Sequence, residues 1–211
     1  MTRLRMLVTA GAIALGFGVG IASAEDSSGK VEAAPANTAT AIFAGGCFWC
    51  VESDFDKLDG VLSTVSGYTG GHTKNPTYKE VVYGNTGHYE AVRITYDPEK
   101  VDYRTLVDYF LRHVDPTDDG GQFCDRGHSY TTAIFVDGPE ERAAAEAALA
   151  VADEVIEDEI VTPILPVSEF TDAEEYHQDY YLKNPLRYRY YRFGCGRDAR
   201  VDEVWGEARH S

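Results

Sequence analysis

The sequence predicts an α+β domain with a central mixed β-sheet and helices packed against it. Short segments with alternating apolar and polar residues, typical of strands, are interspersed with segments that have helical spacing. Some strand-like segments are joined by short glycine-rich turns, which favour antiparallel neighbours, whereas others are separated by helices. Hydrophobic residues make up 44% of the chain and aromatic residues 12%, so the composition supports a packed core.

The first residues are predicted to be a targeting segment that is not part of the fold. Two arginines precede an apolar stretch that ends at Ile21, and Ala22-Ser23-Ala24 fits a small-residue cleavage site. We therefore expect residues 1–24 to be a secretory signal peptide. The apolar stretch is short for a membrane span, which disfavours an uncleaved anchor. Residues 25–37 lack periodicity and are expected to be a flexible linker to a single domain over residues 38–211.

The segment around Cys47 is the first strand-to-helix transition of this domain. A β-prone apolar run over residues 38–44 leads into Gly45-Gly46, and an amphipathic helical pattern follows. Cys47 is therefore expected in the first turn of a helix, where unpaired N–H groups and the helix dipole favour a thiolate. The glycines let another molecule approach the sulfur closely.

The later segments continue to alternate between strand and helix patterns. Residues 89–96 alternate as a strand that closes at Asp97-Pro98, and residues 103–114 carry Leu106 and Phe110 on one helical face. The expected strands are 38–44, 61–68, 89–96, 130–136 and 160–167, and the expected helices are 47–58, 76–83, 103–114, 139–157 and 172–182.

Two regions are expected to be irregular. Residues 115–128 are rich in Asp and Gly, and loops of this length inside compact domains are usually functional. The chain from Asn184 onward, which includes Gly194-Cys195-Gly196, is predicted to be a long irregular C-terminal tail.

The charge of the chain excludes one class of partner. Asp and Glu number 35 against 19 Lys and Arg, which gives a formal net charge of −16. Such a field repels nucleic acid, so no nucleic-acid partner is expected. After the predicted signal peptide no stretch is long and apolar enough to cross a membrane, so no membrane partner is expected after cleavage.

The four cysteines are Cys47, Cys50, Cys124 and Cys195. A Cys-x-x-Cys pair at a helix start is typical of redox-active or metal-binding proteins. Val51 follows the pair where covalent haem attachment needs His, and the other two cysteines do not form the second close pair of a zinc site, so no metal is predicted. Two structural disulfides in an exported protein are an open alternative.

Three further constellations accompany Gly45-Gly46-Cys47-Phe48-Trp49. They are Tyr68-Thr69-Gly70-Gly71 with Asn75-Pro76-Thr77-Tyr78, then Gly84-Asn85-Thr86-Gly87-His88-Tyr89-Glu90, and Asp125-Arg126-Gly127-His128-Ser129-Tyr130. In this order the motifs closely resemble the A-type peptide-methionine sulfoxide reductase family, which acts on the S epimer. The resemblance covers about Ala41 to Cys195. It implies a catalytic domain with a ferredoxin-like, split β-α-β core.

The resemblance implies roles for five residues of this sequence. Cys47 matches the nucleophile that attacks the sulfoxide sulfur. Glu90 matches the proton donor to the sulfoxide oxygen, and an apolar setting should raise its pKa for that role. Tyr78 and Tyr130 match hydroxyl donors to the same oxygen, and Asp125 matches an acidic residue of the pocket.

The resemblance also implies a substrate pocket and a thiol that resolves the Cys47 sulfenic acid. Phe48 and Trp49 match apolar walls for the S-methyl group of the substrate. Cys195, between two glycines, matches the family's resolving cysteine. The family more usually has glycine at the position of Cys50, so Cys50 is a second candidate for this step, and Cys124 is either a further relay thiol or an inert packed one.

Partners and compartment follow from the same resemblance. No bound cofactor is expected, and an external dithiol such as thioredoxin or a thioredoxin-like protein is the implied reductant. The implied substrates are oxidised proteins that carry methionine sulfoxide, and the enzyme is expected to be a monomer that repairs exported proteins. The signal peptide predicts export, and the need for reducing equivalents favours the periplasm over the exterior.

Other function classes fit parts of the sequence. A thiol–disulfide oxidoreductase can use Cys47 and Cys50 as its dithiol, although thioredoxin-type enzymes have a short polar or Pro-containing dipeptide between the cysteines and not Phe-Trp. A secreted binding module can use Cys47–Cys50 and Cys124–Cys195 as structural bridges. A cysteine hydrolase needs a base, and the histidines show no sequence-local sign of one.

Overall fold

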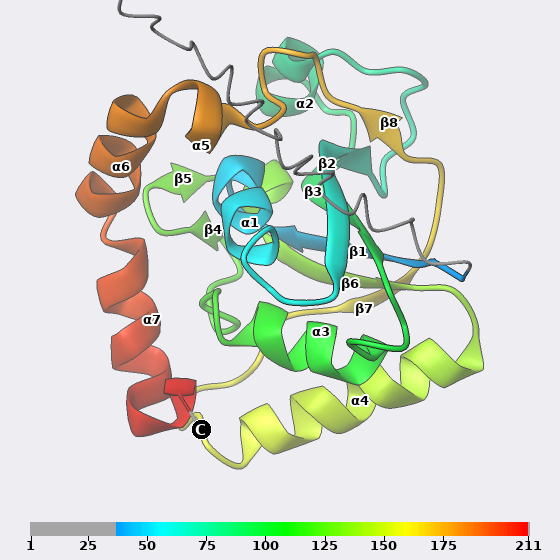
Figure 1. Ribbon diagram of the computed structural model, residues 1–211. Helices are drawn as coiled ribbons and strands as arrows, with labels where there is room; N and C mark the ends of the chain where they lie inside the picture. The colour runs from blue at the N-terminus through cyan, green and yellow to red at the C-terminus, as the bar shows by residue number, and fades with distance from the viewer. Residues whose placement is uncertain (1–36, 211) are drawn as a thin grey trace, which may run out of the picture. The chain divides into compact units, whose positions relative to one another are not determined.

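A six-stranded sheet forms the centre of the computed structural model, which describes residues 37–210 (Figure 1). The strand order is β7-β6-β1-β3-β2-β8. In this sheet β6 and β7 pair in parallel, and the other neighbours are antiparallel, so the predicted mixed sheet of an α+β fold is confirmed. The predicted signal peptide, residues 1–24, and all but the last residue of the predicted linker, residues 25–37, lie outside the described residues.

The strands and helices occur in regular alternation over the first two thirds of the described chain. The strands of the main sheet are β1 (Ala39–Gly45), β2 (Val61–Thr69), β3 (Tyr89–Tyr96), β6 (Thr132–Val136), β7 (Ile164–Pro166) and β8 (Thr171–Asp172), and β4 (Gly121–Gln122) pairs with β5 (Asp125–Arg126) in a separate ribbon. The helices are α1 (Phe48–Phe55), α2 (Tyr78–Tyr83), α3 (Tyr103–Leu111), α4 (Pro139–Asp153), α5 (Tyr180–Lys183), α6 (Pro185–Gly194) and α7 (Arg197–Trp205), with short 3₁₀ turns at η1 (His128–Tyr130) and η2 (Gly206–His210).

The main hydrophobic core lies between the sheet and the helices α1, α3 and α4. Phe43 of β1 stacks between Phe55 of α1 and Phe110 of α3, with ring centroids 5.5 and 4.9 Å apart. All three rings are buried, and offset aromatic contacts of this kind add to the free energy gained from burying their area. The neighbours of Phe43 on β1, Ile42 and Ala44, point to the other face, where a smaller cluster includes Phe170.

The antiparallel order brings three chain segments to one edge of the sheet. Phe43 of β1 pairs with Val92 of β3, so the end of β1 lies beside the start of β3. Gly45 pairs with Thr132, so the start of β6 lies on the other side of the same strand end. The residues that immediately follow β1, begin β3 and precede β6 are therefore neighbours in space.

The C-terminal region differs from the prediction. The prediction of an irregular tail from Asn184 is wrong, because α6 and α7 occupy most of it, along the left of the view in Figure 1. Pro185 starts α6 at a position where its missing N–H has no helical partner to lose. Gly196, at φ +67°, turns the chain between the two helices. The glycines around Cys195 thus separate two helices and do not mark a flexible end.

Three other expectations need correction. The predicted helix 172–182 begins inside β8 and is helical only from Tyr180, since Asp172 pairs with Gly67 of β2 and Asp179 adopts a left-handed conformation. The predicted strand 160–167 is reduced to the three residues of β7. The predicted loop 115–128 contains the β4–β5 ribbon.

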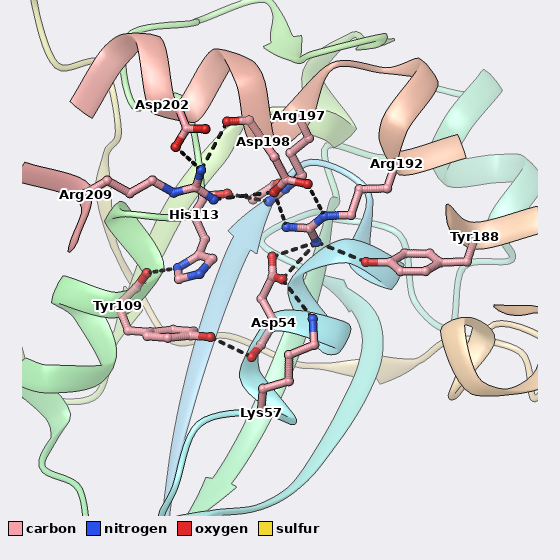
Figure 2. A network of polar contacts seen from close by, with 11 residues as sticks. Asp54, Lys57, Tyr109, His113, Tyr188, Arg192, Arg197, Asp198, Asp202 and Arg209 are labelled. Atoms are coloured by element: carbon pink, nitrogen blue, oxygen red, sulfur yellow. Dashed lines mark hydrogen bonds and ion pairs between the residues drawn. The ribbon is translucent and has the colours of Figure 1, made fainter. Parts of the chain in front are cut away.

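Ion pairs attach the C-terminal helices to α1. The Arg192 guanidinium of α6 binds both carboxylate oxygens of Asp54, at 2.8 and 3.0 Å, and the Tyr188 hydroxyl (Figure 2). It also binds Asp198 of α7, which is in turn bound by Arg209. Asp54 is buried, so this network fixes α6 and α7 against the helix that follows Cys47.

Within residues 37–210, none of the helices combines the length and the apolar character needed to span a bilayer.

Candidate active site

Cys47 lies in the turn between β1 and α1, as the sequence predicts. It is the N-cap residue of α1, and its side chain is 6% exposed. The turn depends on Gly46, which has φ +80°. A Cβ at Gly46 would lie 2.5 Å from the Cβ of Gln122, so only glycine lets the β4 strand pass this close.

A cavity of about 210 Å³ opens beside the Cys47 sulfur. All seven residues predicted to act on the substrate or to hold it line this cavity, together with one that was not predicted, Tyr191. The lining residues are Cys47, Phe48, Trp49, Tyr78, Glu90, Asp125, Tyr130 and Tyr191. They come from α1, α2, β3, β5, η1 and α6, which meet at the edge of the sheet described above.

Glu90 is the buried acid of the cavity. It is 1% exposed, and its Oε2 accepts a hydrogen bond of 3.1 Å from the Phe48 N–H in the first turn of α1. Burial raises the pKa of Glu90 to about 8, and the nearby Asp125 charge acts in the same direction, although the Phe48 and Tyr130 hydrogen bonds oppose the shift. At neutral pH this carboxyl is therefore mostly protonated and can donate a proton.

Two tyrosine hydroxyls lie beside Glu90. Tyr78 begins α2, which the Thr77–Glu80 capping box starts, and Tyr130 ends η1. The two hydroxyls share a hydrogen bond, and Tyr130 also bonds the Glu90 carboxyl. Burial raises the pKa of Tyr78 to about 12 and raises that of Tyr130 further, so both phenols keep their protons. Both are therefore hydrogen-bond donors at neutral pH.

Asp125 is bonded by a residue from the C-terminal helices. The Tyr191 hydroxyl donates to Asp125 Oδ2. Burial raises the pKa of Asp125, whereas the Tyr191 hydrogen bond and the charge of Arg197 lower it. Asp125 thus fixes the Tyr191 ring at the cavity wall.

An aromatic cluster fixes the Trp49 indole. Its ring stacks on Tyr180 of α5 with centroids 3.7 Å apart and meets Tyr191 edge-on. The indole N–H donates to His177 Nδ1 at 3.1 Å. Phe48 packs beneath the cavity against Tyr78 and His177. The walls of the cavity next to the sulfur are therefore apolar and held from several sides.

The sequence interpretation missed Tyr191, Tyr180 and His177. All three lie in the region that was assigned to a wrong helix and an irregular tail. A signal was present: residues 176–191 hold six of the chain's 14 tyrosines, and Pro185 followed by Tyr188, Tyr191 and Arg192 has the spacing of a helix face.

The two thiols of the Cys-x-x-Cys pair are free and in contact. Cys47 and Cys50 are both buried, and a hydrogen bond joins their side chains. Burial raises the pKa of Cys47 well above its ordinary value, and the charges of Cys50 and Glu90 add to this. The expectation that the helix start makes Cys47 a thiolate is thus wrong, because burial outweighs the helix dipole.

The Cys50 thiol behaves in the opposite way. The hydrogen bond from Cys47 lowers its pKa to about 7, and the charges of Arg197 and Arg192 act in the same direction against the effect of burial. The anionic charge of the pair therefore prefers Cys50.

The other two cysteines form a disulfide. Cys124 and Cys195 are bonded, with their Cα atoms 5.0 Å apart. This is one of the two bridges that a structural framework would have, whereas the second, Cys47–Cys50, is open. Cys124 is exposed and Cys195 is half-buried, so a partner in solution can reach this disulfide.

The site offers little to the other chemistries. None of the residues that line the cavity is a histidine, so Cys47 has no imidazole base of the kind that cysteine hydrolases use. Among the described side chains, no three His, Cys, Asp or Glu residues are arranged to hold a metal ion.

Comparison with known proteins gives the family. The sequence profile of the peptide methionine sulfoxide reductases matches residues 39–209. The chain belongs to this family. It is 55% identical over 174 residues to peptide methionine sulfoxide reductase MsrA 2 of Caulobacter vibrioides, which covers 82% of this chain and 88% of the relative. At this identity the chain is an A-type reductase, a peptide-methionine (S)-S-oxide reductase.

Solved structures of the family have the same fold. Mxr1 from Saccharomyces cerevisiae in reduced form superposes with a TM-score of 0.68 at 31% identity, over 72% of this chain and 88% of that one. Methionine sulfoxide reductase A of Corynebacterium diphtheriae gives a TM-score of 0.63 at 36% identity, over 72% of this chain and 77% of its own. The cavity described above is thus the candidate active site of a reductase.

The protonated state of Glu90 sets a pH limit on this reductase. If Glu90 is the proton donor, kcat/KM for a methionine sulfoxide falls as the pH rises through about 8, where its carboxyl ionises. Glu90→Gln should remove this limb and lower kcat by about 10²- to 10⁴-fold, the range of general acid catalysis. Steady-state rates across pH measure both effects. Glu140→Gln, an exposed change on α4, should leave the profile intact, and a Glu90→Gln enzyme with normal rates would contradict the acid role.

Proposed function

We propose that Cys47 reduces the S epimer of methionine sulfoxide with Glu90 as the proton donor. The observation that supports this most strongly is the protonated, buried Glu90 carboxyl in the same small cavity as the Cys47 thiol. A sulfoxide oxygen leaves poorly unless it is protonated, and a carboxyl that keeps its proton at neutral pH supplies what the step needs.

The atoms and protons of this step balance without a cofactor. The Cys47 sulfur attacks the sulfoxide sulfur while Glu90 gives its proton to the sulfoxide oxygen, and the Tyr78 and Tyr130 hydroxyls donate hydrogen bonds to that oxygen. The oxygen passes to Cys47 as its bond to the substrate sulfur breaks, and the thiol proton returns to the Glu90 carboxylate. Methionine sulfoxide is reduced by two electrons to methionine, and Cys47 is oxidised by two electrons to a sulfenic acid.

Binding of the substrate is the step that allows the Cys47 thiol to lose its proton. Burial, and after it the charges of Cys50 and Glu90, raise the pKa of the Cys47 thiol and keep it protonated. A sulfoxide in the cavity takes the hydrogen bonds of Glu90 and the tyrosines, and the proton transfer from Glu90 accompanies the attack. The reactive thiolate thus forms only when a substrate is present.

The apolar walls suit the methyl group of the substrate. Phe48 and the Trp49 indole, fixed by Tyr180 and His177, border the cavity. A methyl group on this side and an oxygen toward Glu90 define the positions of two substituents on the sulfoxide sulfur. The third, the methionine chain, must then point to solvent, and only one epimer satisfies all three positions.

Cys50 is the residue that we propose resolves the sulfenic acid first. It is already in contact with Cys47, whereas Cys195 is bonded to Cys124. The Cys50 thiolate attacks the Cys47 sulfur, the S–O bond breaks and the hydroxide leaves as water after taking a proton, which forms a Cys47–Cys50 disulfide. When Cys124 and Cys195 are both reduced, one of their thiolates can attack the Cys47–Cys50 disulfide, which returns Cys47 and Cys50 to thiols and leaves the Cys124–Cys195 disulfide seen in the structure.

An external dithiol, such as thioredoxin or a thioredoxin-like protein, is the reductant that we propose for the closing step. The exposed Cys124 sulfur gives such a partner access to the Cys124–Cys195 disulfide. Oxidised proteins are the proposed substrates. The monomeric state and the absence of a bound cofactor are part of the same proposal.

The proposal also includes the compartment and the domain organisation. A signal peptide over residues 1–24 and a linker over 25–37 would deliver the catalytic domain to the periplasm, where it would repair exported proteins. The central strand order β6-β1-β3-β2, with α1 and α3 as connections, supports a ferredoxin-like core.

The epimer preference is tested with a blocked methionine sulfoxide and a dithiol reductant. The account predicts turnover of the S epimer and none of the R epimer, because only one arrangement places both the oxygen at Glu90 and the methyl group at Phe48 and Trp49. Separation of the two epimers by chiral chromatography before and after the reaction measures this. Turnover of the R epimer alone, or of neither epimer, would contradict the proposal.

The order of the thiols is tested in a single turnover without reductant. Cys195→Ser should still form a Cys47–Cys50 disulfide, whereas Cys50→Ser should release one methionine per enzyme and leave a sulfenic acid that dimedone traps. Mass spectrometry of proteolytic fragments reads both results. Rapid loss of the sulfenic acid in Cys50→Ser, with its persistence in Cys195→Ser, would assign the first resolving step to Cys195 instead.

A further inference from the structure

Arg197 is a buried guanidinium without a carboxylate partner among the described residues. It is 2% exposed. Its Nη1 donates to the Gly45 carbonyl oxygen at 3.2 Å and its Nη2 to the His113 carbonyl oxygen at 2.9 Å. The group lies over the Phe123 ring, 4.7 Å from its centroid. Its Nε has no hydrogen-bond partner.

The neighbouring arginines, in contrast to Arg197, are paired with carboxylates. Arg192 is paired with Asp54 and Asp198, and Arg209 with Asp198 and Asp202 (Figure 2). Arg197 lies among them in the same view and is bonded to neutral oxygens only. Buried charges in proteins are normally paired, so the burial of Arg197 points to an anion that forms nearby during the reaction.

In the proposed reaction, the anion that forms in this part of the chain is the Cys50 thiolate. Gly45, which Arg197 bonds, is two residues before Cys47, so the guanidinium lies against the turn that starts α1. Cys50 is in the first turn of α1, and Asp54, which Arg192 bonds, is one turn later on the same face. The Arg197 bond to Gly45 and the Arg192 bond to Asp54 thus lie before and after Cys50 along the chain, and both charges act on its thiol.

The remaining groups around Cys50 do not supply the positive charge. The titratable and charged groups that act on Cys50 or are acted on by it are Cys47, Asp54, Glu90, Tyr188, Tyr191, Arg192 and Arg197. Two of these are cations, and the charge of Arg192 is offset by Asp54 and Asp198. Arg197 forms no ion pair among the described residues, and the anions on which its charge acts are the Asp125 carboxylate and the Cys50 thiolate.

We propose that Arg197 is a positioning residue of the resolving step, which holds Cys50 as a thiolate beside the Cys47 sulfenic acid. The inference rests on the proposed role of Cys50 and deepens it. The thiolate attacks the Cys47 sulfur, the S–O bond breaks, and the leaving hydroxide takes a proton to become water. Arg197 exchanges no proton in this step. Its charge stabilises the anion before the attack, and it reaches that place on the first turn of α7, two residues after Cys195.

The direction of the Cys50 titration agrees with this placement. The pKa of Cys50 is lowered to about 7, first by the hydrogen bond from Cys47 and then by the charges of Arg197 and Arg192, although burial opposes both. Without the guanidinium, the effect of burial would be opposed less strongly, so the pKa of Cys50 would rise and the thiol form would be favoured.

The first test titrates Cys50 alone. In a Cys47→Ser background, with a count of one free thiol to verify the Cys124–Cys195 disulfide, the ultraviolet absorbance of the thiolate is followed against pH. Arg197→Met should raise the pKa of Cys50 by about one unit, within the range that a nearby opposite charge produces. Arg197→Lys should restore most of the shift. Arg200→Gln, one turn later on α7 and bonded to Asp115 and Glu203, is the matched control and should leave the titration unchanged.

A second pair of variants tests the charge without removing Arg197. Phe123 is half-buried under the guanidinium, so Phe123→Glu places a carboxylate against Arg197, while Phe123→Gln has the same size and no charge. The proposal predicts a raised Cys50 pKa in the Glu variant and not in the Gln variant. This comparison holds even if Arg197→Met does not fold.

A kinetic measurement separates this proposal from the proposed function. After reduced enzyme is mixed with one equivalent of sulfoxide, methionine release reports the attack of Cys47, and loss of the dimedone-reactive sulfenic acid reports the resolving step. In Arg197→Met the resolving step should slow about three- to fourfold at a pH below the Cys50 pKa, since a tenfold loss of thiolate is partly offset by greater nucleophilicity. Loss of methionine release in the parent enzyme would refute the proposed function. An unchanged Cys50 titration in both Arg197→Met and Phe123→Glu, with normal methionine release, would refute the role of Arg197 alone.

Discussion

The hydrogen bond from the Phe48 N–H to the Glu90 carboxyl ties the first turn of α1 to β3, and the rest of the site is arranged around it. It places the acid beside the sulfur that needs it. It also gives one oxygen of this carboxyl a hydrogen-bond partner, although aromatic side chains enclose the rest of the group. Burial can therefore keep the carboxyl protonated without leaving it unpaired. The antiparallel pairing of β1 and β3 makes this bond possible, because it brings the end of one strand to the start of the other.

The C-terminal helices complete what the sheet begins. The Tyr191 hydroxyl bonds Asp125 at the cavity wall, Tyr188 packs on the cysteine pair, and Arg192 binds Asp54 on α1. These three side chains are spaced as one face of α6. The same segment carries Cys195, whose bond to Cys124 joins α6 and α7 to the β4–β5 ribbon. The segment that carries Cys195 therefore also encloses the Cys47 and Cys50 thiols. This links the redox state of Cys124 and Cys195 to the surroundings of Cys47 and Cys50.

Local sequence patterns were sufficient for the first half of the fold. β3 matches its predicted bounds, and β1, β2 and α3 differ by a few residues, because alternation and helical spacing are strong in these buried segments. The same patterns failed after residue 160. There the helices are short and α6 and α7 have polar compositions. α6 starts at Pro185 and α7 follows Gly196, and both residue types also mark loops. These helices are held by Arg192, Arg197 and Tyr191 through contacts far away in sequence, which no local window contains.

The candidate site divides in a similar way. Cys47, Glu90, Tyr78, Tyr130 and Asp125 were predicted from motifs, and the structure brings them into one cavity. The state of each group was harder to predict. The helix start suggested a Cys47 thiolate, whereas burial and the neighbouring Cys50 keep that thiol protonated and leave the charge on Cys50. Desolvation depends on the atoms that surround a group in three dimensions, and the C-terminal helices supply many of them.

The account depends most on a protonated Glu90 at neutral pH. Infrared spectroscopy of the full-length protein can measure this directly, as the carboxylic acid C=O band that disappears in Glu90→Gln. The account predicts that the band is present at pH 7 and is lost with a midpoint of about 8 as the pH rises. A Glu90 carboxyl that is already ionised at pH 7, with a midpoint near the ordinary value for glutamate of about 4.3, would contradict it.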